Sequence, residues 1–261
     1  MLVLTAIFTM PSAGRTGGCT AQEKLAISHV EFRVVTDVLL GNQTEPAQQT
    51  LTLFSGGVAY DISFDDPNQI AMVDVDRDRI VLINKELQIQ TSIDLKKLQQ
   101  YIESARKQAE TSNLAVYLKG AEQIEVVNAA VTVGDQVLRY QASLQQPRDE
   151  QMAEQYARAA DALSLLNGWR SGVPPFARLS LNRVVAEQKS LPEEITRTAS
   201  NGKQTEVVRC RLHANYRLST EDKQQVAEIG KLLVSFRTVS EQEFFSASGK
   251  PAAKVARNGT E

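Results

Sequence analysis

The chain has 261 residues, enough for one large domain or two small ones with a buried core. Its 29 Lys and Arg against 31 Asp and Glu give a net charge of −2, which argues against a nucleic-acid or anionic-membrane binder, because such proteins carry a basic surplus. Two Cys and two His leave little for a disulfide framework, a zinc site or a His-based catalytic set.

The first residues have the pattern of an export signal. Leu2 to Met10 is an apolar run that is too short to cross a bilayer as a helix but has the length of a signal h-region, although no basic residue precedes Arg15. We expect residues 1–22 to be an export leader, with Cys19 as a lipidation site in a less favoured alternative. The protein would then be periplasmic or part of the cell envelope, and cytoplasmic if the run is not a signal. No other segment is apolar and long enough to predict a transmembrane span.

Period-two alternation runs from Ile27 to Asp94 and predicts β-strands. The connections, among them the turn at Gly56-Gly57, are too short for crossovers, so the strands are predicted to form an antiparallel meander. The apolar positions of two of these strands are the candidate wall of a ligand site, namely Val30, Phe32, Val34, Val58, Tyr60, Ile62 and Phe64.

A helix and a hairpin are predicted next. Asp94 is placed to cap a helix whose apolar residues recur three and four apart as far as Ala109. The hairpin is predicted to have arms at 124–133 and 136–144, turning at Gly134-Asp135.

Two further helices are predicted after this hairpin. One begins after Asp149 and is expected to end at Gly168, which leaves Trp169 in a loop. The other has Pro174-Pro175 in its first turn and extends to about Gln188.

The last predicted hairpin turns at Asn201-Gly202, a strong signal for a two-residue loop. This loop would place Glu194 opposite Arg209 and Arg197 opposite Glu206. Ser219 and Asp222 are predicted to form a capping box at the start of a final helix. We expect residues 23–245 to form a single α+β domain and residues 246–261 to be a disordered tail. The simplest packing is a curved, half-barrel-like antiparallel sheet covered on its inner face by amphipathic helices.

Three alternating carboxylates, Asp74, Asp76 and Asp78, resemble the start of a calcium loop. Such a loop requires Gly at position 79 and Glu at position 85, where this chain has Arg79 and Lys85. We therefore interpret the cluster as a charged turn at a strand end. A hydrolase using Asp74 and Asp76 is the least favoured functional hypothesis.

A cationic stripe is predicted on one face of the last hairpin. Arg209, Arg211 and Arg217, with His213, share a face and are candidates for holding phosphate or a lipid head group. The favoured interpretation is that they form the solvated face of an amphipathic strand. Cys210 lies on the opposite, apolar face and is interpreted as a small buried hydrophobe.

The stretch Ser55-Gly56-Gly57-Val58-Ala59-Tyr60-Asp61-Ile62, with Ile70 to Asp76 and Arg79 to Ile83, resembles the central meander of bacterial outer-membrane lipoprotein carriers. The resemblance covers about residues 27–93. It implies a curved half-barrel sheet with helices that shelter acyl chains in an apolar cavity. This chain departs from the family in the long helices predicted between Asp94 and Gln188, and no ligand-contact residue can be transferred. In overall layout the chain also resembles uncharacterised exported bacterial proteins.

These observations favour an exported, non-catalytic protein that binds a lipid or another apolar molecule between sheet and helices. His29 and His213 are the only imidazoles and neither lies in a nucleophile–base pattern, so we expect no enzyme, no catalytic residues, no cofactor and no metal. The alternative is a structural or protein-interaction module of the cell envelope without a ligand cavity, with an envelope protein as its partner.

Overall fold

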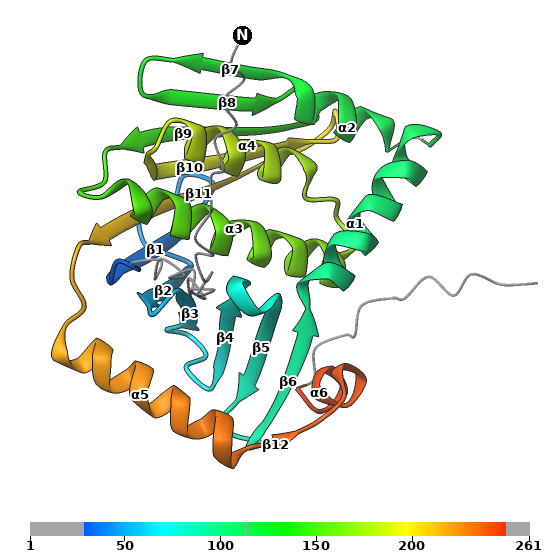
Figure 1. The fold of residues 1–261 in the computed structure, drawn as a ribbon. Helices are drawn as coiled ribbons and strands as arrows, with labels where there is room; N and C mark the ends of the chain where they lie inside the picture. Colours follow the sequence, from blue (N-terminus) through cyan, green and yellow to red (C-terminus); the bar gives the residue numbers. More distant parts are fainter. Residues whose placement is uncertain (1–28, 113, 249–261) are drawn as a thin grey trace, which may run out of the picture.

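A computed structural model describes residues 29–112 and 114–248. The described residues form an α+β fold in which a curved, twelve-stranded sheet is covered by helices (Figure 1). The predicted fold class is confirmed. The predicted export leader, residues 1–22, lies outside the described residues.

The strands follow the chain order β1 Phe32–Leu40, β2 Gln48–Ser55, β3 Val58–Ser63, β4 Gln69–Asp74, β5 Arg79–Asn84, β6 Ile89–Asp94, β7 Ile124–Val127, β8 Ala130–Gly134, β9 Leu138–Gln145, β10 Leu191–Ser200, β11 Thr205–Asn215 and β12 Arg237–Thr238. The helices are α1 Leu95–Glu110, α2 Ala115–Glu122, α3 Glu150–Ser171, α4 Phe176–Glu187, α5 Thr220–Ser235 and α6 Glu241–Ala247, and a short 3₁₀ turn, η1, spans Val75–Arg77.

The sheet has the order β12-β6-β5-β4-β3-β2-β1-β11-β10-β9-β8-β7, so β12 and β7 are its two edges and it is not closed. Every pairing is antiparallel except the short parallel contact between β12 and β6. The predicted meander corresponds to β1–β6. At the centre of the sheet, β1 lies between β2 and the late strand β11. Its pairing with β11 comprises eight residue pairs, from Arg33↔Asn215 to Leu40↔Val208.

Both faces of the sheet are covered, and strand alternation assigns each residue to one of them. On the concave face, Phe32, Val34 and Phe54 join the main core with α1, α3 and α4. On the opposite face, Leu51, Leu53 and other residues form a second core against α5. The sequence predicted helices on the inner face alone; α5 is the helix that covers the outer face (Figure 1).

The position of α5 is held by a buried ion pair and a cap. Asp222 is 4% exposed in its side chain and lies 3.0 Å from Nη1 of Arg33 on β1. The same carboxylate accepts a hydrogen bond from the backbone N–H of Ser219, whose hydroxyl accepts one from the Asp222 N–H, so the predicted capping box is confirmed. One side chain therefore both begins the helix and attaches it to the sheet.

Helix α3 differs from the prediction because it continues through Gly168 and Trp169 to Ser171, and Gly172 ends it with a left-handed φ of 71°. Gly168 has a packing role instead of a terminating one. A Cβ at Gly168 would lie 2.8 Å from Cδ of Pro175, so the missing side chain lets the α3–α4 connection pack on the helix. The predicted cap of α1 by Asp94 is confirmed by the hydrogen bond from the Lys96 N–H.

Two hairpins also differ from the prediction. The arm predicted at 124–133 is two strands, β7 and β8, because Asn128 adopts a left-handed φ of 54° and turns the chain. In the last hairpin Ser200 pairs with Thr205, so the loop has four residues, which shifts the register by two and places Glu194 opposite Arg211. The Asn201 side chain stabilises this longer loop by accepting hydrogen bonds from the N–H groups of Lys203 and Gln204.

The chain end was predicted as a tail from residue 246, but α6 continues to Ala247. Its Phe244 and Phe245 are buried and pack with Trp169 of α3. Residues 249–261 of the predicted tail lie outside the described residues.

Candidate functional site

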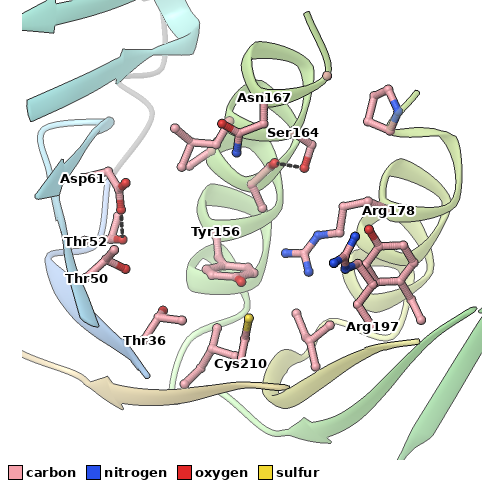
Figure 2. A pocket seen from close by; sticks show the side chains of 18 of the residues that line it. Thr36, Thr50, Thr52, Asp61, Tyr156, Ser164, Asn167, Arg178, Arg197 and Cys210 are labelled. Carbon is pink, nitrogen blue, oxygen red and sulfur yellow. Dashed lines mark hydrogen bonds between the residues drawn. The ribbon is translucent and has the colours of Figure 1, made fainter. Parts of the chain in front are cut away.

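A cavity of about 550 Å³ lies between the concave face of the sheet and helices α3 and α4. Its lining combines the sheet floor, the two helices and the α3–α4 connection (Figure 2). The exposed lining residues Ser171 and Val173 belong to the end of α3 and to that connection, so the cavity meets solvent there. A second, smaller cavity of about 240 Å³ adjoins it, sharing Thr50 and Asp61, and extends towards α6.

The floor is polar where β1, β2 and β3 meet. Thr36 pairs with Thr50 and Thr52 with Asp61, so the alternation of three neighbouring strands brings all four side chains to the concave face. Thr52 donates a hydrogen bond from its hydroxyl to the Asp61 carboxylate at 2.8 Å. This pair is the acidic end of the cavity.

Asp61 is half-buried and lines the cavity. Burial raises the pKa of the Asp61 carboxyl, and the hydrogen bond from Thr52 partly opposes the rise. The protonated form is therefore favoured here more than it is on a protein surface.

The opposite end is cationic. Arg178 enters the cavity from the first turn of α4, and Arg197 enters from β10 (Figure 2). Arg197 is paired, since its Nη2 lies 2.6 Å from Glu206. Among the described residues no carboxylate forms an ion pair with Arg178.

Two tyrosines and a cysteine lie between these ends. Burial raises the pKa of Tyr156, while the charge of Arg178 and a hydrogen bond from its guanidinium oppose the rise. Burial also raises the pKa of Tyr140 and of the Cys210 thiol, and both Arg178 and Arg197 oppose these rises. The two arginines therefore act on the same part of the cavity. Cys210 is a half-buried thiol in the lining, with its protonated form favoured.

The remaining lining is largely apolar. It includes Phe54, Ala159, Ala160, Leu163, Ile195 and Leu212, and Ser164, Asn167 and Ser171 of α3 add neutral polar groups. The cavity thus has an apolar middle between a carboxyl end and a guanidinium end, an arrangement that can hold an elongated molecule with one polar terminus.

The predicted apolar wall is not where the cavity lies. Phe32 and Val34 are on the concave face but within the packed core, with Val30 beside them. Val58, Tyr60 and Ile62 are on the other face, in the core under α5. Phe64 is 48% exposed at the end of β3. None of the seven is among the residues that line the 550 Å³ cavity.

The predicted cationic stripe lies on the outer face of the sheet, away from this cavity. Arg211 pairs with Glu194 at 2.9 Å, and Arg209 donates to the backbone carbonyl of Gln43. Arg217 lies beyond the end of β11, so it does not share a strand face with the other two. The prediction that Glu194 pairs with Arg209 is wrong, because the register of the hairpin is shifted.

The alternating aspartates form a charged turn. Asp74 is 2% exposed and pairs with Arg77 and Arg79, while Asp76 pairs with Arg158. Asp78 has a left-handed φ of 52° and pairs with Lys96, so the three carboxylates are neutralised by different cations. Within residues 29–112 and 114–248, no group of three or more His, Cys, Asp or Glu residues is arranged to hold a metal ion.

Arg178 and Asp61, which give the cavity its charged ends, were not among the residues predicted from the sequence. A signal for Asp61 was present, because it is a carboxylate within an otherwise apolar strand. Arg178 gave no such signal, since it is one of many cations on predicted helices.

No family model and no curated protein matches the chain. In the part of the chain that the structure describes, no helix combines the length and apolar character that crossing a membrane requires.

Proposed function

We propose that this protein is a non-catalytic binding protein that holds a lipid or another largely apolar molecule between its sheet and helices α3 and α4. The observation that carries the proposal is the cavity of about 550 Å³ at this position. This volume lies within the roughly 300–1,000 Å³ of small-molecule sites, and the cavity lies between two layers of the fold, where such sites are common.

The composition of the lining supports binding. Most of the exposed lining area is apolar, and charged groups lie only at the two ends, while Ser164, Asn167 and Ser171 of α3 add neutral polar groups between them. Such a pattern is typical of small-molecule sites, where apolar contacts supply affinity and a few polar groups set orientation. The adjoining cavity of about 240 Å³ offers further length for a chain-like ligand.

The absence of catalysis is part of the proposal and has two physical supports. The Cys210 thiol has a raised pKa, which disfavours the nucleophilic thiolate. Both imidazoles pair with aspartates that do not line the cavity, His29 with Asp76 and His213 with Asp37.

We further propose that the protein is exported to the periplasm or cell envelope. The apolar run at Leu2 to Met10 supports this step. The intact mass of the protein recovered from an envelope fraction tests it, because removal of the leader lowers the mass by that of the missing residues.

Binding is tested by native mass spectrometry after gentle purification, followed by titration with dodecanol. We expect a retained apolar molecule or saturable binding of dodecanol. The variant Thr36→Phe places a ring in the cavity from β1 and should abolish binding. Thr196→Phe is the matched control. Thr196 is also a half-buried threonine on a strand, but it lies opposite Arg209 on the outer face of the sheet, away from the cavity. Loss of binding in both variants, or no binding by the unaltered protein, would refute the proposal.

An envelope interaction module is the second candidate, and one observation favours it. The edge strand β7 exposes Ile124, Val126 and Val127, the last at 52%. An apolar sheet edge with unpaired backbone groups is suited to strand addition by a partner. A stable partner recovered by cross-linking and lost in Val126→Lys, together with no ligand in the cavity, would favour this function over the first.

A further inference from the structure

We propose that the ligand is an anionic amphiphile, a single acyl-type chain with a carboxylate or phosphate head, and that Arg178 binds the head. This inference rests on the proposed function, since it specifies the ligand of the same cavity. The structure supports it through the charge state of the cavity, the donors around Arg178 and the position of the apolar lining.

Arg178 is the central observation. Its guanidinium is half-buried in a cavity wall, and among the described residues no carboxylate is paired with it. Asp161, a carboxylate close enough for the Arg178 charge to affect its pKa, accepts a hydrogen bond from Nδ2 of Asn182 at 2.8 Å. A half-buried guanidinium that faces a cavity and has no paired carboxylate favours an anion there.

The neighbouring groups favour an anion at the same end. The hydroxyls of Tyr140 and Tyr156 have raised pKa values, so they remain protonated and available as hydrogen-bond donors. Helix α4 begins at this end, and the positive end of its dipole adds to the charge of Arg178. Arg197 contributes less, because Glu206 neutralises it.

The opposite end explains the orientation of the ligand. Asp61 lies across the cavity from Arg178, with Tyr156 between them (Figure 2). The Asp61 end supplies no cation to an anionic head, and its carboxyl repels such a head whenever it is ionised, so the head is directed to Arg178. The chain then lies along Phe54, Leu163 and the alanines of α3. One anionic group and one apolar chain satisfy both the charge and the apolar lining.

Titration calorimetry with four ligands that share a dodecyl-length chain tests the proposal, namely dodecanoate, dodecyl phosphate, dodecanol and dodecyltrimethylammonium. We expect dodecanoate or dodecyl phosphate to bind about 10- to 100-fold more tightly than dodecanol, the ratio supplied by one charge-assisted hydrogen bond. The cationic ligand should bind most weakly. The tighter of the two anions identifies the head group as carboxylate or phosphate.

The variant Arg178→Gln should remove the preference for the anion while dodecanol still binds. Arg183→Gln is the matched control, because Arg183 is also on α4 but is 63% exposed, pairs with Glu187 and is not in the lining. It should leave the preference unchanged. If Arg178→Gln fails to fold, Arg178→Lys keeps the charge and should retain most of the preference.

The outcomes separate the two proposals. Equal binding of dodecanoate, dodecyl phosphate and dodecanol by the unaltered protein overturns the anionic ligand and leaves the cavity function standing. A preference for the anion that persists in Arg178→Gln overturns the role of Arg178. Binding of none of the four ligands overturns the proposed function itself, and this inference with it.

Discussion

The variant Asp61→Asn should stabilise the protein at neutral pH. Burial raises the pKa of the Asp61 carboxyl in the folded state, so the folded protein binds this proton more tightly than the unfolded chain does. The contribution of Asp61 to stability is therefore largest at acidic pH and decreases as pH rises from the pKa of the unfolded state through the raised pKa of the folded state. Above that range, the folded protein carries a carboxylate whose burial costs free energy.

The expected magnitude is that of burying a polar group whose hydrogen bonds are only partly satisfied, about 1–3 kcal/mol in proteins. Asn is neutral at every pH and has nearly the same shape, and its carbonyl oxygen can accept the 2.8 Å hydrogen bond that Thr52 now donates to Asp61. The gain in the free energy of unfolding should thus be on the order of 1 kcal/mol at pH 7 and should shrink as the pH falls towards 3.

Urea unfolding of both proteins at several pH values between 3 and 8 measures this difference. Thr52→Val is the control, because it removes the hydrogen bond that stabilises the carboxylate and should cost about 1.5–3 kcal/mol at pH 7. An Asp61→Asn protein that is less stable than the unaltered one at pH 7, or a difference that does not depend on pH, would show that burial does not penalise the charged form of Asp61.

Three further predictions concern packing. Gly168→Ala should destabilise by about 1–3 kcal/mol, since its Cβ would clash with a proline ring of the α3–α4 connection, and a higher melting temperature would show that the clash is relieved. Asp222→Ala should cost about 3 kcal/mol in urea unfolding, because it leaves Arg33 unpaired and removes a cap, and a loss below 0.5 kcal/mol would contradict the role of this pair. Phe245→Ala should cost about 3–5 kcal/mol and shift the emission of Trp169, the only tryptophan, to longer wavelength, whereas unchanged emission would place α6 elsewhere.

Local patterns predicted most of the fold. Alternation identified β1–β6, and side-chain caps located the starts of α1 and α5. The errors arise where packing or a side-chain hydrogen bond overrides the usual meaning of a turn residue. Gly168 has the form of a helix end, but it lies within α3 because Pro175 packs against it. Asn201-Gly202 has the form of a two-residue turn, but the Asn201 side chain stabilises a four-residue loop.

The site was harder to predict because both faces of the sheet are covered. On β3, Val58, Tyr60 and Ile62 alternate as predicted, but the apolar face that they form packs against α5 and not against the cavity. Alternation distinguishes two faces of a strand but does not say which layer covers each. The cavity lies on the concave face of the sheet, to which the alternate residues of β3, among them Asp61, belong. Which face of β3 is covered by α5 depends on where that helix returns to the sheet.

The pairing of β1 with β11 has a consequence for how the molecule acquires its structure. These strands are separated by most of the chain, yet they join the two halves of the sheet. During synthesis β1 can pair with β2 early, while its other side has no partner until residue 215 has emerged. An unpaired strand edge of this kind is prone to aggregation, and contacts of such large sequence separation form slowly. Refolding from denaturant should therefore be slow for a chain of this size and its yield should fall as the protein concentration rises, because the open edge can then meet another chain first.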